Sequence, residues 1–328
     1  MRAVLFGRSA VAHWLTADRP PDARRMDGGC LERCNPSVRT VAHISMELPH
    51  IPEPYHCLVP GRYRRLSDKV VLHISQRRYA KGDFSHIAPG VFAACPELAL
   101  AQLAPSATLC ELITVASALC GTFCFRADAE GGLGHRSPLT SKRRIAAFVS
   151  RHAGLKGVKA LRRALPHIVE RAASPPEIFL LMVLGLPRLH GGYGLLGGRA
   201  NRRMRLGRGA RAIAGRETIV PDVHWLDEGV VLEYDSNAEH LTPAQVTRDS
   251  KKRLAYASRG LKVLTVTARQ LYDAASMRHV AKELSRDLGR SLRIRGDSFG
   301  AKHAALYETA FCLNAYRRVA GAERLAES

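Results

Sequence analysis

The chain of 328 residues carries 50 lysines and arginines against 29 aspartates and glutamates, which gives a formal net charge of +21. An apolar share of 46% is ample for the cores of the two domains that this length favours, and the positive charge favours binding to polyanions. No run approaches the roughly 18 apolar residues of a membrane span, and Met1–Trp14 lacks a signal-peptide cleavage site, so we expect no membrane association and no secretory signal.

The N-terminal part, residues 1–170, is predicted to form a smaller domain of mixed strands and helices. Runs of β-prone residues predict strands at Tyr55–Val59 and Lys69–Ile74. Apolar spacing predicts helices at Pro96–Leu103 and Leu109–Leu119. This order of short strands followed by helices weakly resembles abortive-infection antitoxin-like regulators, and that resemblance implies a regulatory role as an alternative function.

The eight cysteines define neither a metal site nor a disulfide framework. The pairs Cys30/Cys34 and Cys120/Cys124 are each separated by three residues, but no histidine follows either pair at zinc-finger spacing. Because most cysteines lie in apolar segments, we expect buried, reduced thiols and a cytoplasmic location.

Two basic stretches precede the C-terminal part. In the first, apolar spacing predicts helices with basic outer faces, formed by Arg143, Arg144, Arg151, Lys156, Lys159, Arg162 and Arg163. Such faces either contact phosphates or are solvated. The second stretch contains glycines and no acid, and we expect either a flexible loop that clamps a nucleic-acid backbone or a solvated arm. Its arginines are Arg199, Arg202, Arg203, Arg205, Arg208, Arg211 and Arg216.

A β-hairpin is predicted after the second basic stretch. Thr218–Leu226 and Val230–Asp235 are β-prone runs, and a polar turn at Asp227-Glu228-Gly229 separates them. A turn centred on Asp227 and Glu228 fixes which residues face each other. The predicted cross-strand pairs are Asp222 with Glu233, Val223 with Leu232, and Trp225 with Val230.

The predicted register gathers three acids. Alternation places Asp222, Glu233 and Asp235 on one face of the hairpin and the apolar pairs on the other face. Opposed carboxylates repel each other unless a positive group lies close to them. Two interpretations stay open at this point: a solvated face paired with Arg248 or Arg253, and a bound cation.

The residues after the hairpin predict a loop, a helix, a strand and a further helix. Glu239-His240 ends a polar loop, and Thr242-Pro243 begins a helix that stops at Gly260. Leu261–Thr267 is apolar enough to be a buried strand, and an amphipathic helix follows it. Together with a helix expected at Pro176–Leu186, this order predicts an α/β sandwich with a mixed sheet.

These motifs resemble one nuclease family. The chain is similar to the very-short-patch-repair-type endonuclease domain of the PD-(D/E)XK nuclease superfamily in Pro221-Asp222, Glu233-Tyr234-Asp235, Glu239-His240, a helix with Asp249 and Arg253, and a Gly-x-x-Val-x-x-Val-Thr strand from Gly260. The resemblance covers roughly Ser174 to Leu288. It implies an α/β (α+β) class with a restriction-endonuclease-like mixed sheet flanked by helices, over residues 171–295, followed by a helical tail at 296–328.

Carried over residue by residue, the resemblance implies a catalytic centre. Asp222 and Glu233 are its metal ligands, Asp235 stands where many superfamily members have lysine, His240 is the loop histidine, and Glu177 is the helix glutamate. Hard oxygen ligands suit Mg²⁺ or Mn²⁺ better than zinc. The family usually has glycine after the second aspartate, whereas this chain has Ser236, which tolerates unusual backbone angles less well.

The implied function is a Mg²⁺-dependent endonuclease or nickase acting on double-stranded DNA. The metal would polarise a phosphodiester, and His240 would act as a general base or neutralise charge on phosphorus. The phosphates on either side of the cleaved one would be bound by arginines, namely Arg199, Arg202, Arg203, Arg205, Arg208, Arg248 and Arg253. Two alternatives stay open. One is a non-catalytic, antitoxin-like DNA-binding regulator that keeps the nuclease fold, and the other is an interaction scaffold whose acids pair with its own arginines.

Overall fold

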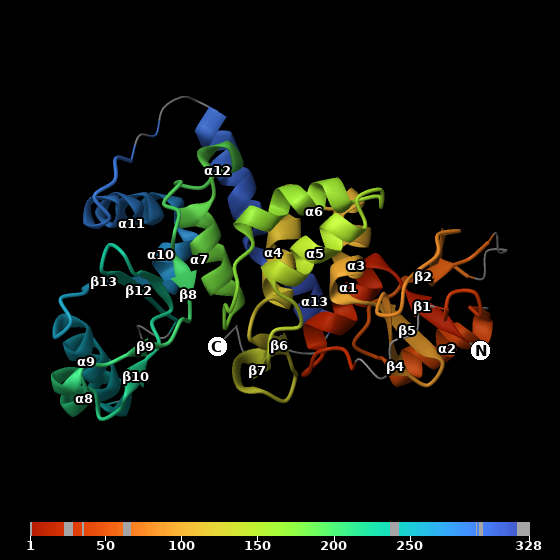
Figure 1. Cartoon of the computed structure of the whole chain (residues 1–328), viewed down its shortest axis with the longest axis horizontal. Helices are drawn as coiled ribbons and strands as arrows, with labels where there is room; N and C mark the ends of the chain where they lie inside the picture. The colour runs from red at the N-terminus through yellow and green to blue at the C-terminus, as the bar shows by residue number, and fades with distance from the viewer. Residues whose placement is uncertain are drawn as a thin grey trace. The chain divides into compact units, whose positions relative to one another are not determined.

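The structure is a computed structural model that describes residues 2–22, 29–34, 36–61, 67–236, 243–292, 294 and 298–319. Contacts divide the chain into two compact units: unit 1 is Met1–Ile168 with Phe311–Ser328, and unit 2 is Val169–Ala310. Figure 1 shows the first segment of unit 1 from red to yellow-green, unit 2 from green to blue, and α13, which belongs to unit 1, in the darkest blue. Both units combine helices with open sheets, which confirms the predicted mixed α+β class.

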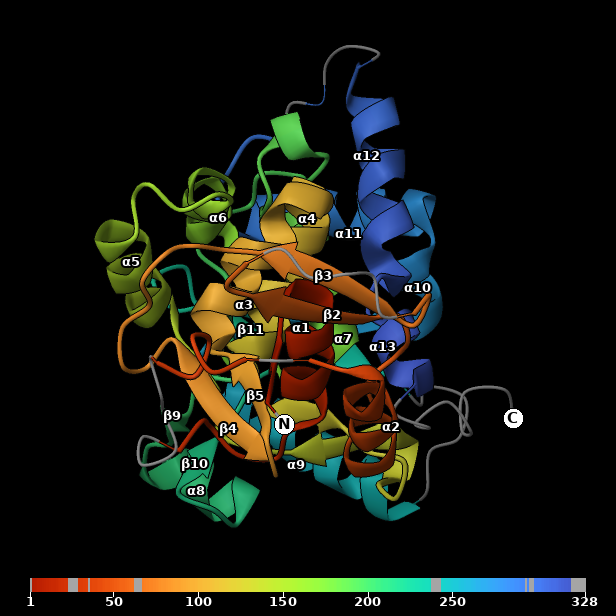
Figure 2. The same ribbon diagram turned by 90° about the vertical axis from the view of Figure 1, so that its right-hand side faces the viewer.

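Unit 1 is built on a five-stranded mixed sheet with the order β3-β2-β1-β5-β4. The central strand β1 pairs parallel with β5 and antiparallel with β2. The bounds are β1 Ala3–Leu5, β2 Tyr55–Val59, β3 Val70–Ile74, β4 Phe84–Ala88 and β5 Val91–Ala94. Figure 2 shows this sheet with α1 (Gly7–Thr16) beside it. The apolar start of the chain therefore forms core elements of unit 1.

The helices of unit 1 include both predicted ones, at the expected bounds. They are α1 Gly7–Thr16, α2 Val38–Glu47, α3 Pro96–Leu103, α4 Leu109–Leu119, α5 Lys142–Arg151, α6 Val158–Ala164 and α13 Asn314–Val319. A separate hairpin pairs β6 (Phe123–Phe125) with β7 (Leu133–His135). Ile145 and Phe148 of α5 and Leu161 of α6 are buried, which confirms amphipathic helices in the first basic stretch.

A buried arginine links the ends of two helices in unit 1. Arg136 is 2% exposed. Its guanidinium donates to the carbonyls of Trp14 and, at 2.9 Å, Ala17 at the end of α1, and to the carbonyl of Ala118 in α4 at 3.0 Å. Helix C-termini leave carbonyls without an intrahelical donor and carry partial negative charge. One side chain therefore satisfies carbonyls from both helices.

Unit 2 contains a four-stranded mixed sheet with the order β13-β12-β11-β8. Its strands are β8 Arg199–Ala200, β11 Val223–Trp225, β12 Val230–Asp235 and β13 Lys262–Thr267. The hairpin register is the predicted one, with Val223 opposite Leu232 and Trp225 opposite Val230. Gly229 closes the turn at φ 67°, an angle that favours glycine. β13 pairs parallel with β12.

Two strand predictions in unit 2 were wrong in detail. The run Thr218–Leu226 forms two strands, because β10 (Thr218–Ile219) pairs with β9 (Met204–Arg205) in a separate sheet. Pro221 lies between β10 and β11 and lacks the N–H that a continuous ladder needs. β13 is an edge strand in which only Val266 is buried, whereas we expected a buried strand.

The arginine-rich stretch is an ordered part of unit 2, so the expectation of a flexible loop or solvated arm was wrong. It forms β8, β9, α8 (Arg208–Ala214) and β10. The apolar residues between its arginines pack into one buried cluster with Val231 of β12 and two residues of α9 (Pro243–Ala257). The cluster consists of Met204, Leu206, Ala210, Ala214, Ile219, Val231, Ala255 and Tyr256. The apolar positions therefore fix the path of the chain.

Helices cover both faces of the four-stranded sheet. α8 and α9 cover the face of Val231 and Glu233. The other helices are α7 Pro175–Gly185, α10 Ala268–Tyr272, α11 Ala274–Asp287 and α12 Ser298–Glu308. On the opposite face Gly198 lies so close to Trp225 that a Cβ would meet the ring at 2.7 Å and Leu181 of α7 at 3.0 Å. The face predicted to carry Asp222, Glu233 and Asp235 also carries the buried side chains of His224 and Val231.

The short 3₁₀ helices complete the description of the two units. They are η2 Ala104–Ser106, η3 Glu130–Gly132, η4 Leu165–His167, η5 Arg188–His190 and η6 Thr309–Phe311. The segment predicted as a C-terminal tail is divided between the units, with α12 in unit 2 and α13 in unit 1. Within the described ranges, no helix has the length and apolar character needed to cross a bilayer.

Candidate functional site

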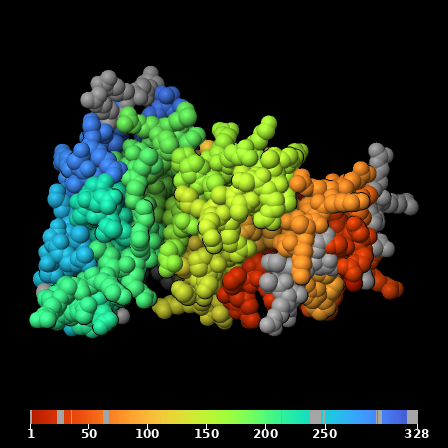
Figure 3. All heavy atoms as spheres, in the orientation of Figure 1, coloured from red at the N-terminus to blue at the C-terminus, as the bar shows by residue number. Residues whose placement is uncertain are grey.

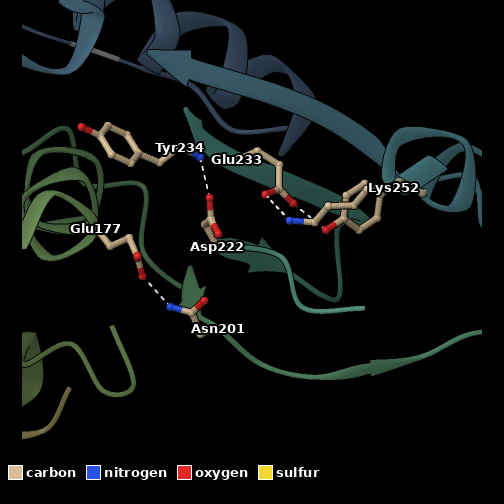
Figure 4. A network of polar contacts seen from close by, with 7 residues as sticks. Glu177, Asn201, Asp222, Glu233, Tyr234 and Lys252 are labelled. Carbon is tan, nitrogen blue, oxygen red and sulfur yellow. Dashed lines mark hydrogen bonds and ion pairs between the residues drawn. The ribbon is translucent and has the colours of Figure 1, made fainter. Parts of the chain in front are cut away.

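Asp222 is fixed at the point where β11 begins. Its main-chain carbonyl accepts a hydrogen bond from the N–H of Asn201 at 3.0 Å, which extends the pairing of β8 with β11. Its carboxylate Oδ2 accepts from the N–H of Tyr234 on β12 at 2.7 Å (Figure 4). Oδ1 accepts no hydrogen bond from any residue that the structure describes. One carboxylate oxygen is therefore held by the sheet, and the other has no hydrogen-bond partner within the described ranges.

Glu233 lies on β12, one position beyond the Val223–Leu232 pair and thus opposite Asp222, as predicted. Its Oε2 is 2.6 Å from Nζ of Lys252, and its Oε1 accepts from the hydroxyl of Tyr256 at 2.5 Å. Lys252 and Tyr256 are four residues apart on α9 and so share one side of that helix. Figure 4 shows Lys252 reaching Glu233 from the helix above the strand. The acid therefore pairs with Lys252 and not with the exposed Arg253.

The electrostatics of Glu233 reflect its two neighbours of opposite sign. Burial and, second, the negative charge of Asp222 raise the pKa of Glu233 to about 7, against the lowering effect of Lys252. Burial and the nearby Glu233 likewise raise the pKa of the Tyr256 hydroxyl. The pair of acids thus carries negative charge that one ammonium group does not fully neutralise.

Glu177 has a structural role at the start of α7. Its Oε1 accepts from the hydroxyl of the N-cap Ser174 at 2.9 Å, and its Oε2 accepts from the N–H of Ala173 at 2.9 Å. Oε2 also accepts from Nδ2 of Asn201 at 2.5 Å. Burial raises the pKa of this carboxyl, and the charge of Asp222 adds to the effect. Glu177 therefore caps the helix and positions Asn201, and its predicted membership of the catalytic acid set stays a prediction.

Asn201 was not singled out in the sequence. It adopts φ 46°, in the left-handed region, which asparagine tolerates better than most residues. In this conformation its N–H reaches the carbonyl of Asp222, and its side chain reaches Glu177. Asn201 therefore links the helix glutamate to the strand aspartate.

The other predicted residues of the centre are only partly placed. Asp235 ends β12 in register with Thr267 of β13 and is half-buried. His240 lies outside the described residues, and so does the side chain of Arg248. Arg253 is exposed on α9. Ser236 does not adopt a positive φ, so this position does not take the left-handed conformation that glycine would permit.

Two of the predicted phosphate-binding arginines lie beside the strand of Asp222. Arg199 is the register partner of His224 across β8 and β11. Burial and, second, the positive charges of Arg202 and Arg199 lower the pKa of His224. The remaining three in this stretch, Arg203, Arg205 and Arg208, are exposed on or beside β9 and α8. Two arginines therefore lie close to His224 on the strand that follows Asp222.

The donor set fits a hard divalent cation. No group of three or more histidine, cysteine, aspartate or glutamate side chains is arranged around a possible metal position within the described ranges. Mg²⁺ does not need such a cage, because it keeps several waters and binds through one or two carboxylates together with substrate phosphates. Asp222 and Glu233 supply two such neighbouring carboxylates.

Comparisons with protein-family models, with curated proteins and with solved structures found no match to this chain. What the chain does is therefore inferred from its motifs and from the contacts among its own residues. The contacts that bear on function are those of Asp222, Glu233 and Lys252 in unit 2.

Glu233→Gln should change how stability depends on pH. The folded-state pKa of Glu233, about 7, lies above the usual glutamate value near 4.3. The folded state therefore binds the Glu233 proton more tightly than the unfolded state does. The stability that this protonation adds at low pH is lost as the pH rises through 7. The free energy of unfolding of the variant, relative to that of wild type, should therefore rise by up to about 3 kcal/mol between pH 5 and pH 8.

Urea unfolding at several pH values measures this difference. The exposed Glu217→Gln is the matched control and should show a flat difference across the same range, because the Glu217 side chain is 84% exposed. If wild type and Glu233→Gln differed in free energy of unfolding by the same amount at pH 5 and at pH 8, the raised pKa of Glu233 would be contradicted.

Proposed function

We propose that unit 2 is a Mg²⁺-dependent DNA endonuclease or nickase in which Asp222 and Glu233 hold the cation. The carrying observation is the opposed pair of carboxylates, with one Asp222 oxygen that accepts no hydrogen bond from the described residues and a pKa of Glu233 raised by burial and by the charge of Asp222. A cation between them would relieve that repulsion. The similarity of the hairpin, helix and strand to the PD-(D/E)XK nucleases supports the same assignment.

The chain's own residues supply the other parts of the reaction. A bound Mg²⁺ supplies Lewis-acid polarisation of the phosphodiester and a more acidic water. In the free protein Lys252 forms an ion pair with Glu233. When Glu233 binds the cation instead, the ammonium group of Lys252 would be free to bind a non-bridging phosphate oxygen. Asn201 and Tyr234 fix Asp222 through the sheet, so its orientation is set before substrate binds.

Double-stranded DNA is the proposed substrate because two arginines lie beside β11, the strand that follows Asp222, and the whole chain carries a net charge of +21. Arg199 and Arg202 lie near β11 and would bind phosphates that flank the scissile one. Backbone contacts of this kind carry no sequence information, so they account for affinity and register rather than target choice.

Nicking of supercoiled plasmid by the full chain tests the proposal. We expect conversion to the open-circular or linear form with Mg²⁺ or Mn²⁺ and none with EDTA. Cleavage that persists in EDTA would contradict a metal-dependent mechanism. DNA binding without cleavage under any divalent cation would favour the alternative, an antitoxin-like regulator that uses the same fold as a DNA-binding platform.

Lys252→Met should lower the nicking rate and shift its pH dependence. Loss of the ammonium group removes the charge that lowers the pKa of Glu233, so that pKa rises further. The acidic limb of the rate profile should therefore move to higher pH, with a loss of roughly 10-fold to 100-fold at neutral pH. Lys251→Met is the matched control, because Lys251 is exposed on the same helix. Equal losses in both variants would argue against a specific role for Lys252.

A further inference from the structure

We propose that one surface of unit 1 docks the backbone of double-stranded DNA. This basic face is the outer side of α5, α6 and the turn between them, and it carries Arg143, Arg151, Lys156, Lys159, Arg162 and Arg163. The proposal goes beyond the proposed function, because docking on this face needs neither Asp222 nor Glu233. Figure 3 shows this part of unit 1, in yellow-green, on the surface that faces the viewer.

The basic face lies in the longest acid-free part of the first half of the chain. Between Glu130 and Glu170 there are nine lysines and arginines and no aspartate or glutamate. Like charges gathered on one surface repel each other, and no carboxylate in this segment offsets that repulsion. A polyanion is the partner that such a surface fits.

Two cations of this segment pair with other groups of unit 1, and the six of the basic face make no such pair among the described residues. Lys142 donates to the carbonyl of Pro166 at 2.8 Å, and Arg144 pairs with the buried Glu97 at 3.0 Å. Both side chains therefore hold unit 1 together. The six cations of the basic face are exposed and make no hydrogen bond or ion pair with any part of the chain that the structure describes. Their charge is available to a partner.

The spacing of these cations suits a duplex backbone. Lys159, Arg162 and Arg163 are three and four residues apart and so point to one side of α6. Arg143 and Arg151 are separated by two turns of α5, about 12 Å at 1.5 Å per residue. Duplex DNA carries one negative charge per about 1.7 Å of axis, so a surface of this length meets several phosphates.

The surface is held rigidly and extends onto a neighbouring loop. Ile145, Phe148 and Leu161 are buried beneath it. Arg77, from the loop between β3 and β4, lies with its guanidinium 3.1 Å from Nδ1 of His152 at the end of α5. The exposed Arg77 therefore adds a cation from a distant part of the sequence to the same side of unit 1.

The composition of the basic face favours nucleic acid over a lipid surface. None of the large apolar side chains that are exposed in the described residues lies on α5, α6 or their connecting turn. A helix that lies on a membrane inserts an apolar face alongside its cations. Here the apolar faces of both helices are used by the core. The basic face can therefore bind phosphates but has no apolar side to insert into a membrane.

The test measures binding of a fluorescein-labelled 30-base-pair duplex to the full chain in EDTA, where no metal-dependent cleavage occurs. The first variant is Lys159→Gln with Arg162→Gln and Arg163→Gln. We expect at least a tenfold loss of affinity at 100 mM NaCl. The slope of log K against log [NaCl] should fall by roughly 0.9 for each lost phosphate contact, or about 2 to 3 in total.

A matched control removes three cations of unit 1 that are already paired with acids. It combines Arg19→Gln, Lys69→Gln and Arg126→Gln, whose partners are Asp18, Glu53 and Asp128. The net charge changes by the same amount, so we expect less than a threefold change in affinity. A second variant on the other helix, Arg143→Gln with Arg151→Gln, should weaken binding even if the α6 variant fails to fold.

Equal losses in the α6 variant and the matched control would overturn the proposal, because they would show that only overall charge matters. Unchanged binding in the folded α5 variant would also overturn it. Loss of binding to phosphatidylserine vesicles with DNA binding unchanged would assign the face to a lipid surface instead. The proposed function fails separately, by an absence of Mg²⁺-dependent nicking, so the two failures are distinguishable.

Discussion

Replacing Asp222 with asparagine should lower the rate of plasmid nicking by about 100-fold or more. Asparagine has the shape of aspartate and can still accept the N–H of Tyr234, so the pairing of β11 with β12 should survive. What disappears is the negative charge of the carboxylate that would bind the cation. Lewis-acid stabilisation is worth several kcal/mol, and each 1.36 kcal/mol corresponds to a factor of ten in rate.

The matched control for this variant is Asp227→Asn. Asp227 is exposed in the turn of the same hairpin, so the identical chemical change should leave nicking at the wild-type rate. Circular dichroism and the thermal midpoint would show that both variants fold. Wild-type nicking by the Asp222→Asn variant would remove this aspartate from the reaction.

Replacing Arg136 with methionine should strongly destabilise unit 1. Methionine fills a similar volume but leaves the carbonyls of Trp14, Ala17 and Ala118 without their donor. Hydrogen bonds to a charged group contribute about 1.5–3 kcal/mol each, and the effects of neighbouring bonds are not additive. We expect a loss of about 3–5 kcal/mol, measured by urea unfolding of unit 1.

The control for Arg136 is a cation in unit 1 whose partner is exposed to solvent. Lys69 pairs with Glu53 at 3.0 Å, and the Lys69 side chain is 61% exposed. Lys69→Met should therefore leave the unfolding midpoint nearly unchanged. If both variants unfolded at the same urea concentration, Arg136 would not be the link between α1 and α4 that its hydrogen bonds indicate.

The hairpin was predictable because two local rules agree on it. The turn at Asp227-Glu228-Gly229 sets the register, and alternation then assigns every side chain between Val223 and Leu232 to a face. The same rules could not show that helices cover the acid face. That outcome depends on tertiary packing, which brings Tyr256 and the apolar residues of the arginine-rich stretch onto Val231.

The partners of the acids show where sequence reasoning ends. Lys252 and Tyr256 are four residues apart, and that spacing predicts a shared side of α9. The spacing does not say which side of α9 faces the sheet, so Arg253, which is exposed on another side of the helix, was an equally good candidate for pairing with Glu233. The role of Asn201 depends on a left-handed backbone angle and on the pairing of β8 with β11.

Glu177 shows a second limit of the same kind. A glutamate three residues after Ser174 fits a helix cap as well as a ligand, and the pattern Ser-x-x-Glu is typical of a capping box. Only the structure shows that Ser174, Ala173 and Asn201 occupy both carboxylate oxygens. The capping signal was present in the sequence, and the structure shows the cap that it predicts.

Direct binding of Mn²⁺ tests most simply whether Asp222 and Glu233 form a cation site. Electron paramagnetic resonance of free Mn²⁺ during titration reports binding without any need for cleavage. We predict one Mn²⁺ bound per wild-type chain, displaced by Mg²⁺, and a loss of that site in Asp222→Asn but not in Asp227→Asn. No binding by the wild-type chain, or equal binding by wild type and Asp222→Asn, would contradict the metal centre.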